Sequence, residues 1–158
     1  LCRQYLECSS FSIDWFDETI GTCNIYNVSC PERFVWHENA LKCYSSPVIN
    51  LTLGSNTVPV CKGLHPEATP VEPRNLIQMD IILNMTDGDI WLGMYRPQTS
   101  QIADDFRYYS DGSKIGYQNW YPGNPSNSQQ NCIMVFYQFS RKWVDIFCTV
   151  KAGLICEL

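Results

Sequence analysis

The sequence contains little charge of either sign. Only 17% of its 158 residues are Asp, Glu, Lys or Arg, which is below the ~25% of an average soluble domain. The 11 basic residues stand against 16 acidic ones, and the formal net charge is −5. Proteins that bind nucleic acid usually carry a basic stripe that faces the phosphates, so this balance argues against a nucleic-acid partner.

Long apolar runs are also missing. A membrane helix needs ~18 consecutive apolar residues, whereas the longest runs resemble Ile-Met-Val-Phe at 133–136. We therefore expect no membrane insertion in this segment. The chain starts at Leu1-Cys2-Arg3, with neither Met nor the apolar stretch of a signal peptide. We expect either that a signal peptide has been removed or that the chain is a piece of a longer protein.

Histidine is scarce, and none of the nine cysteines forms a C-x-x-C pair. The only histidines are His37 and His65, so both a zinc site and a catalytic Cys–His pair are disfavoured. The cysteines instead favour a disulfide framework in an oxidising compartment. Three glycosylation sequons, at Asn27, Asn50 and Asn84, agree with secretion. The sequence thus predicts an extracellular protein, either secreted or the ectodomain of a membrane protein.

Aromatic residues, in contrast, are abundant. The chain has 7 Phe, 5 Trp and 9 Tyr, or 21 in all, which is enough large apolar surface to build a packed core and to exclude disorder along the whole length. The length fits one domain plus a small extra piece. Short apolar runs alternate with turn-rich segments, which predicts an α+β fold, rich in loops and stapled by disulfides.

Several local patterns refine this prediction. Residues 1–29 indicate a hairpin that a Cys8–Cys23 bond would staple, and 30–44 indicate a second hairpin closed by its end cysteines. The three prolines of 65–73 exclude a continuous helix, so we expect an extended loop there. The apolar positions of 74–83 suit either a helix or a strand. A buried strand is expected at 89–95, and closing strands are expected at 133–139, 143–147 and 153–156.

In this order, residues 30–158 resemble the C-type lectin-like domain family. The resemblance rests on six ordered elements: Cys30-Pro31 through Cys43-Tyr44, Trp91-Leu92-Gly93-Met94, Asp111-Gly112-Ser113, Trp120-Tyr121-Pro122-Gly123-Asn124-Pro125 with Asn131-Cys132, Trp143-Val144-Asp145 with Cys148, and Leu154-Ile155-Cys156-Glu157. It implies mixed, loop-rich sheets with one or two helices. Because Pro47, Gly54 and Pro59 interrupt the region of the family's first helix, we expect that helix to be short or irregular.

The resemblance also implies a pairing for most of the cysteines. The expected bridges are Cys30–Cys43, Cys61–Cys156 and Cys132–Cys148.

Residues 1–29 resemble, with fewer matching residues, the C-terminal part of a PAN/apple-like module; a plain N-terminal extension is the alternative. An odd number of cysteines leaves one without an internal partner. We expect this to be Cys2, which either stays unpaired, bonds to an upstream cysteine or links two chains in a dimer.

Sugar-binding members of the family hold Ca²⁺ with a Glu-Pro-Asn or Gln-Pro-Asp tripeptide, a Glu before the next cysteine and a Trp-Asn-Asp tripeptide. Carried over to this sequence, those ligand positions fall on five residues: Asn124, Ser126, Gln130, Val144 and Asp145. Asp145 is the only carboxylate among them, and Ca²⁺ affinity follows the charge of its oxygen ligands. We therefore expect neither a calcium ion nor any other cofactor. Asp145 is expected to bond to loop backbone, and Pro125 to keep the cis peptide bond seen in the family.

The loop around these positions combines aromatic rings with amides, a mixture that suits contacts with protein or sugar. The candidate ligand-binding residues are Tyr117, Asn119, Trp120, Tyr121, Asn124, Ser126, Asn127, Gln130 and Asn131. We expect a recognition module, in a cell-surface or secreted receptor-like protein, that binds a protein or glycan partner without calcium. The alternatives are a calcium-dependent lectin with an altered ligand set and a structural module that oligomerises through Cys2. The sequence contains no nucleophile–base or carboxylate pair that would indicate an enzyme.

Overall fold

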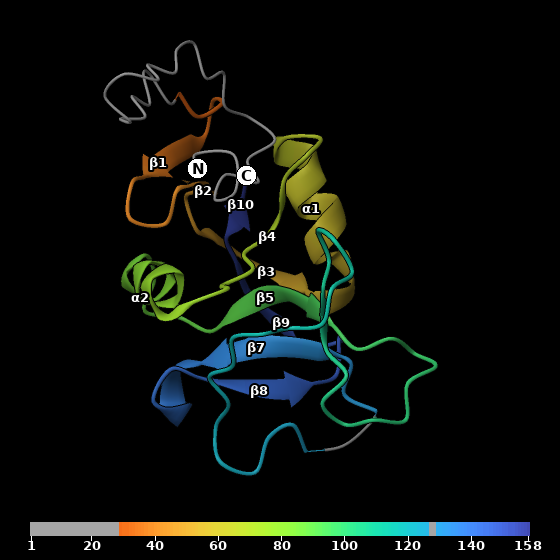
Figure 1. Ribbon diagram of the computed structural model, residues 1–158. Helices are drawn as coiled ribbons and strands as arrows, with labels where there is room; N and C mark the ends of the chain where they lie inside the picture. Colours follow the sequence, from red (N-terminus) through yellow and green to blue (C-terminus); the bar gives the residue numbers. More distant parts are fainter. Residues whose placement is uncertain (1–28, 127–128) are drawn as a thin grey trace, which may run out of the picture. The chain divides into compact units, whose positions relative to one another are not determined.

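The computed structural model describes residues 29–126 and 129–158, and only the backbone of 49–51. The expectations for Cys2, the Cys8–Cys23 bridge, the PAN/apple-like segment, Asn27 and Asn127 lie outside the described residues. Pro31–Leu158 form one compact unit, which has the predicted α+β architecture (Figure 1).

The unit contains two sheets. The smaller has the order β1-β2-β10-β4, and the larger has the order β3-β9-β5-β7-β8 with β6 added beside β5. Strands β5 and β9 run parallel, whereas the other strand pairs of the described residues are antiparallel. The strands are β1 (Phe34–His37), β2 (Lys42–Ser45), β3 (Val48–Leu53), β4 (Thr69–Pro70), β5 (Ile90–Tyr95), β6 (Arg107–Tyr108), β7 (Cys132–Phe136), β8 (Lys142–Ile146), β9 (Lys151–Leu154) and β10 (Cys156–Glu157).

Two α-helices flank the sheets. The first, α1 (Thr57–Leu64), is only eight residues long and follows the 3-10 turn η2 (Gly54–Asn56). The predicted short first helix is thus confirmed, and Pro59 fits because the missing amide lies in the first helical turn, where amides have no partner within the helix. The ambiguous segment after Pro73 forms the helix α2 (Leu76–Asn84), and the Asn75 side chain caps it by accepting a bond from the Gln78 amide.

The strand predicted over 133–139 is too long. Strand β7 ends at Phe136, and Tyr137–Phe139 form the 3-10 turn η3. The next two residues, Ser140 and Arg141, have φ angles of 54° and 57°. Positive φ at two consecutive residues reverses the chain tightly into β8, and this reversal ends the strand pairing early.

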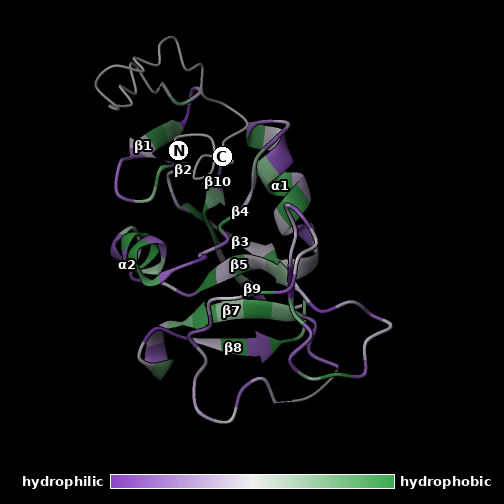
Figure 2. Cartoon of the chain, viewed as in Figure 1, coloured by the Kyte–Doolittle hydropathy of each residue, from purple (hydrophilic) through white to green (hydrophobic). Residues whose placement is uncertain are grey.

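The larger sheet carries the centre of the core. Trp91 on β5 and Trp143 on β8 are both buried, and the hydropathy colours show that β5 and β7 are mainly apolar (Figure 2). Gly93 lies where β5 passes β4, and a Cβ atom there would be 2.2 Å from the carbonyl oxygen of Pro70. Only a residue without a side chain allows the strands to approach this closely.

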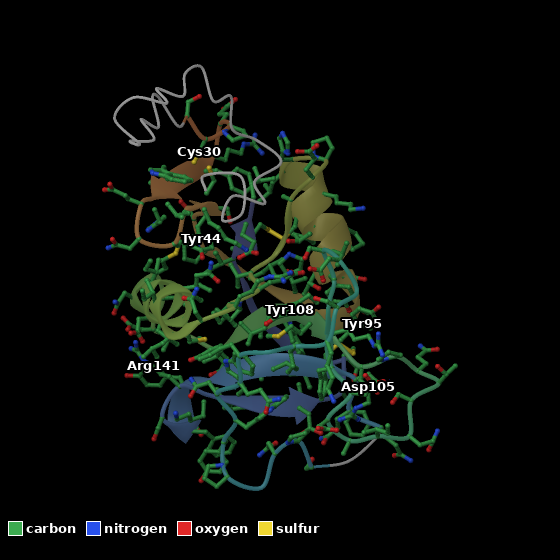
Figure 3. All side chains as sticks on the ribbon, in the orientation of Figure 1. Cys30, Tyr44, Tyr95, Asp105, Tyr108 and Arg141 are labelled. Atoms are coloured by element: carbon green, nitrogen blue, oxygen red, sulfur yellow. A yellow bond between two sulfur atoms is a disulfide. The ribbon has the colours of Figure 1, made fainter. Side chains whose placement is uncertain are left out.

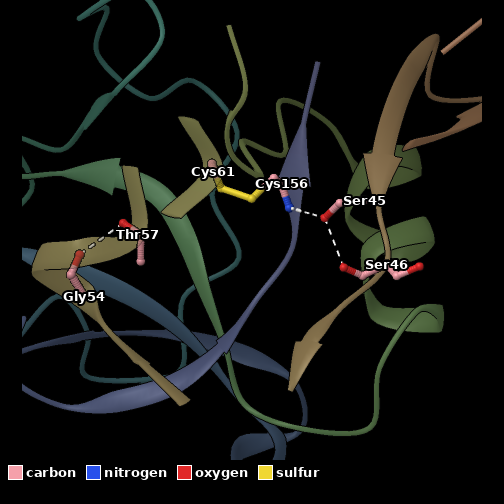
Figure 4. Close-up of a disulfide and its surroundings, with 6 residues drawn as sticks. All are labelled: Ser45, Ser46, Gly54, Thr57, Cys61 and Cys156. Atoms are coloured by element: carbon pink, nitrogen blue, oxygen red, sulfur yellow. Dashed lines mark hydrogen bonds between the residues drawn. A yellow bond between two sulfur atoms is a disulfide. The ribbon is translucent and has the colours of Figure 1, made fainter. Parts of the chain in front are cut away.

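Disulfides join distant parts of the chain. Cys61–Cys156 links α1 to β10, and the Ser45 hydroxyl on β2 accepts a bond from the Cys156 amide at 3.0 Å (Figure 4). Cys132–Cys148 links β7 to the segment after β8. Both bridges match the expected pairs. Cys30 and Cys43 are each disulfide-bonded as well, while the pairing between them remains a prediction.

Candidate ligand-binding loop

The long polar loop between β6 and β7 is held against the core at its middle. The Trp143 amide donates to the carbonyl of Asn119 at 2.9 Å, and the Tyr121 amide donates to the carbonyl of Trp143 at 2.8 Å. These two bonds place the loop alongside β8, and the coloured part of the loop that follows Tyr121 lies below β8 in the view of Figure 1. Strand β8 therefore holds the loop backbone on both sides of Trp120.

Two of the three candidate aromatic rings support the loop from inside. Trp120 meets Trp143 edge-on with ring centroids 5.6 Å apart and contacts Phe106 at 5.3 Å. Tyr117 meets Trp143 edge-on from another side, at 5.4 Å. Tyr121 is different, because it is 36% exposed and stacks on Phe139 at 4.6 Å. Of these three candidate rings, the exposed Tyr121 is thus the one best placed to touch a ligand.

The peptide bond between Asn124 and Pro125 is cis, as expected. Just after it, the Ser126 amide donates to Asp145 Oδ1 at 2.7 Å. The Ser126 hydroxyl donates to Gln130 Oε1 at 2.5 Å and lies 3.4 Å from Asp145 Oδ2. The expectation that Asp145 bonds to loop backbone is therefore confirmed. Of the family's calcium positions, Ser126 contacts both Gln130 and Asp145, and Asn124 precedes the cis bond.

The side chain of Arg96, which the sequence did not indicate as a site residue, contacts Asp145 from the interior of the protein. Arg96 follows β5 directly, and its side chain and that of Asp145 are fully buried, with Nη2 3.6 Å from Oδ2. The guanidinium also donates to the carbonyl of Ala103 and lies 4.5 Å from the ring centroid of Phe106. Burial lowers the pKa of Arg96, and attraction to Asp145 opposes that change. The one carboxylate of the degenerate calcium set thus lies between the Ser126 amide and an arginine of the same chain.

The remaining calcium position offers no side-chain oxygen. Val144 is buried on β8, and the residues at 29–126 and 129–158 contain no group of three or more His, Cys, Asp or Glu that could hold a metal ion. Around the loop, Ser126 and Gln129 are exposed, while Asn119, Asn124, Gln130 and Asn131 are partly exposed. Among the described candidate residues, the accessible chemistry is therefore that of hydroxyls, amides and the ring of Tyr121.

A second buried carboxylate lies outside the loop, between β4 and α2. Glu72 accepts bonds from the amide and the hydroxyl of Ser110, at 2.8 and 2.5 Å, and Arg74 lies 3.4 Å away. Burial raises the pKa of Glu72 to about 7, and repulsion from Glu157 adds to the shift, whereas the Ser110 bonds and Lys42 oppose it. These contacts join the segment between β4 and α2 to the turn that follows β6.

Comparisons with known proteins support the identification of the fold. A family model described as "Lectin C-type domain" matches residues 55–158. Human chondrolectin is 33% identical over 86 residues, and the match covers 46% of this chain and 32% of chondrolectin. The chain therefore spans about a third of the length of this curated relative.

Two solved structures have the same fold. The cow C-type carbohydrate-recognition domain of CD23, determined in the presence of the oligosaccharide GlcNAc2Man3, is 24% identical with a TM-score of 0.66, covering 82% of this chain and 95% of that one. A calcium-independent type II antifreeze protein is 17% identical with a TM-score of 0.71, covering 85% and 98%.

Proposed function

The chain belongs to the C-type lectin domain family, and from that premise we propose that it is an extracellular recognition module whose long loop binds a protein or glycan partner without calcium. The family and fold are those of recognition modules, and its curated relatives include receptor-like proteins. The disulfide bridges are consistent with an extracellular location. Neither helix within the described ranges is both long and apolar enough to span a bilayer.

The contact between Arg96 and Asp145 carries the proposal. A calcium ion at the family's position would need the Asp145 carboxylate as a ligand, but that carboxylate already interacts with the Arg96 guanidinium and the Ser126 amide. Its negative charge is compensated inside the protein. A divalent cation placed beside a buried guanidinium would also be repelled by it. Arg96 therefore takes over the role of neutralising Asp145, and the loop can keep its shape without a metal.

The surface of the loop supports a partner of mixed polarity. Tyr121 offers one exposed aromatic face, and the amides of Asn124 and Gln130 can both donate and accept hydrogen bonds. Rings and amides together suit protein surfaces and also the hydroxyls of sugars. The cow CD23 domain was solved in the presence of an oligosaccharide, which supports a glycan as one class of partner. A type II antifreeze protein of the same fold is calcium-independent, which supports recognition without calcium.

A binding screen tests this proposal. The purified 158-residue chain is applied to a glycan array and to intact cells, in buffer with EDTA and in buffer with added Ca²⁺. We expect any binding partner to bind equally in both buffers, and we expect Tyr121→Ala and Asn124→Ala to weaken binding at least tenfold. Lys62→Ala, at an exposed position on α1, is the matched control and should bind like the unchanged chain.

Two results would contradict the proposal. Binding that EDTA abolishes and Ca²⁺ restores would support the alternative of a calcium-dependent lectin with an altered ligand set. Binding that survives both loop substitutions but responds to changes elsewhere would move recognition to another surface.

A further inference from the structure

An exposed group of aromatic rings lies at the end of the β7–β8 hairpin. We call Tyr121, Phe136, Tyr137 and Phe139 the hairpin aromatic cluster. Phe139 is in contact with two of these rings, with centroids 4.6 Å from Tyr121 and 5.1 Å from Phe136. Tyr137 is 51% exposed and Phe139 37% exposed. Adjoining exposed rings on a soluble protein usually mark a surface that something covers.

Arg141 connects this cluster to the end of α2. Its Nη1 donates to the carbonyl of Leu83 at 2.9 Å, and its Nη2 donates to Asp87 Oδ1 at 3.0 Å. The same guanidinium lies 5.3 Å from the centroid of the Tyr137 ring. Figure 3 shows Arg141 between α2 and the end of the β7–β8 hairpin. The last turn of α2 and the ring of Tyr137 are therefore neighbours, bridged by one side chain.

The glycosylation sequon at Asn84 begins at this contact. Asn84 is the last residue of α2, directly follows Leu83, and is exposed. We propose that Asn84 carries an N-linked glycan whose first sugars lie over Tyr137 and cover that side of the hairpin aromatic cluster. The proposal rests on the extracellular location that the proposed function assumes.

The covalent step occurs during secretion. The amide nitrogen of Asn84 forms a bond to the anomeric carbon of an oligosaccharide carried on a lipid diphosphate. The bond between that carbon and the diphosphate oxygen breaks, the lipid diphosphate leaves with the bonding electrons, and the amide loses one proton. The resulting sugar is neutral, polyhydroxylated and fixed to the rim of the cluster.

The chemistry around Tyr137 matches such a sugar better than it matches a charged partner. The exposed ring can pack against the C–H face of a pyranose. Arg141 donates hydrogen bonds and the highly exposed Asp87 accepts them, so both kinds of partner for hydroxyl and acetamido groups lie beside the ring. Arg141 and Asp87 compensate each other's charge, and the other carboxylate beside the ring, Asp89, accepts a bond from the Tyr137 amide at 2.7 Å.

The test isolates this glycan. Asn27→Gln and Asn50→Gln are introduced together so that Asn84 is the only sequon left, and the chain is secreted from animal cells. Mass spectrometry of the peptide that contains Asn84 should show it occupied. Hydroxyl-radical footprinting should then label Tyr137 at least twofold less in the glycosylated chain than in the Asn84→Gln variant. Phe147, which is 50% exposed at the opposite end of β8, is the matched control and should be labelled equally in both.

Thermal melting provides a second readout. The glycan should raise the melting temperature by about 2–4 °C, the shift expected for ~1 kcal/mol in a domain of this size. That increase should disappear in Tyr137→Ala and persist in Phe147→Ala. An unoccupied Asn84, equal labelling of Tyr137 with and without the glycan, or the same increase in Tyr137→Ala would overturn the proposal. None of these readouts uses ligand binding, so they are independent of the outcome for the long loop.

Discussion

At the scale of the residue, Arg96 and Asp145 bring opposite charges into the interior at the base of the long loop. Both side chains are fully buried, and the two charged groups are 3.6 Å apart. Such a pair contributes little net stability against an apolar replacement, because desolvation of two ions offsets their attraction. Removing only one partner is different, since it leaves an uncompensated charge in the core.

Arg96→Met should therefore lower the free energy of unfolding by about 3–5 kcal/mol, measured by urea denaturation. The double variant Arg96→Met, Asp145→Leu should recover much of that loss, because neither charge remains. The matched control is Arg107→Met, which removes a 41% exposed partner of Asp105 at 3.3 Å and should cost less than ~1 kcal/mol. If Arg96→Met cost no more than the control, the buried pair would not have the role assigned to it.

Glu72 gives the molecule a pH dependence opposite in sign to that of most carboxylates. Its folded-state pKa is raised from 4.5 to about 7, mainly by burial. Between these values the folded state holds a proton that the unfolded state has released, so stability falls as pH rises. At 1.36 kcal/mol per pKa unit, the contribution that is lost between about pH 4.5 and pH 7 amounts to about 3 kcal/mol.

Urea denaturation at several pH values checks this. The unchanged chain should lose stability relative to Glu72→Gln as pH rises from about 4.5 to about 7, because glutamine cannot ionise. If the free energy of unfolding changed equally with pH in the two proteins across that window, Glu72 would not titrate there.

At the scale of the element, β5 is the strand on which most of the architecture depends. It pairs with β6, β7 and β9, and Gly93 brings it against β4. The site that a Cβ atom would occupy is 2.2 Å from the Pro70 carbonyl oxygen and 2.7 Å from Glu72 Cγ. The carbonyl is backbone and cannot turn aside, so β4 or β5 would have to move.

Gly93→Ala should thus destabilise the protein by about 3 kcal/mol or more, at the upper end of what overpacking of a core costs. Gly63 on α1 is the matched control, because its Cβ position has no atom within 4 Å. There, an alanine should stabilise the protein by up to ~1 kcal/mol through helix propensity. Equal melting temperatures for the two variants would contradict this account of the contact between β4 and β5.

The helix α2 shows where sequence patterns stop being sufficient. The apolar residues in 74–83 fit the period of a helix and also that of a strand. The helix buries Met79 and Ile82 but leaves Leu76 and Ile77 more than half exposed. The apolar pattern is therefore an imperfect guide to the buried face. The decisive signal is local, because the Asn75 side chain caps the first turn. That cap can be read from a sequence once a helix start is assumed, but it does not exclude a strand.

At the scale of the whole molecule, the resemblance of the sequence to the family predicted the fold, the Cys61–Cys156 and Cys132–Cys148 disulfides and the cis bond before Pro125. The functional details were harder. Arg96 looks like an ordinary surface residue, and only folding brings it to Asp145, 49 positions along the chain. Trp120 lies in a polar segment but packs between Phe106 and Trp143. Burial of a charge or a loop ring depends on contacts distant in sequence, which composition and spacing do not reveal.

The Cys61–Cys156 disulfide joins α1 to β10. The guanidinium of Arg96 neutralises Asp145 at the base of the long loop. The claim on which the function depends is that Asp145 is already satisfied by Arg96 and the Ser126 amide. Isothermal titration of Ca²⁺ into the metal-free chain tests it most directly. We expect no saturable heat up to millimolar Ca²⁺ and an unchanged melting temperature. Uptake of one ion per chain with a micromolar Kd, lost in Asp145→Asn, would contradict it.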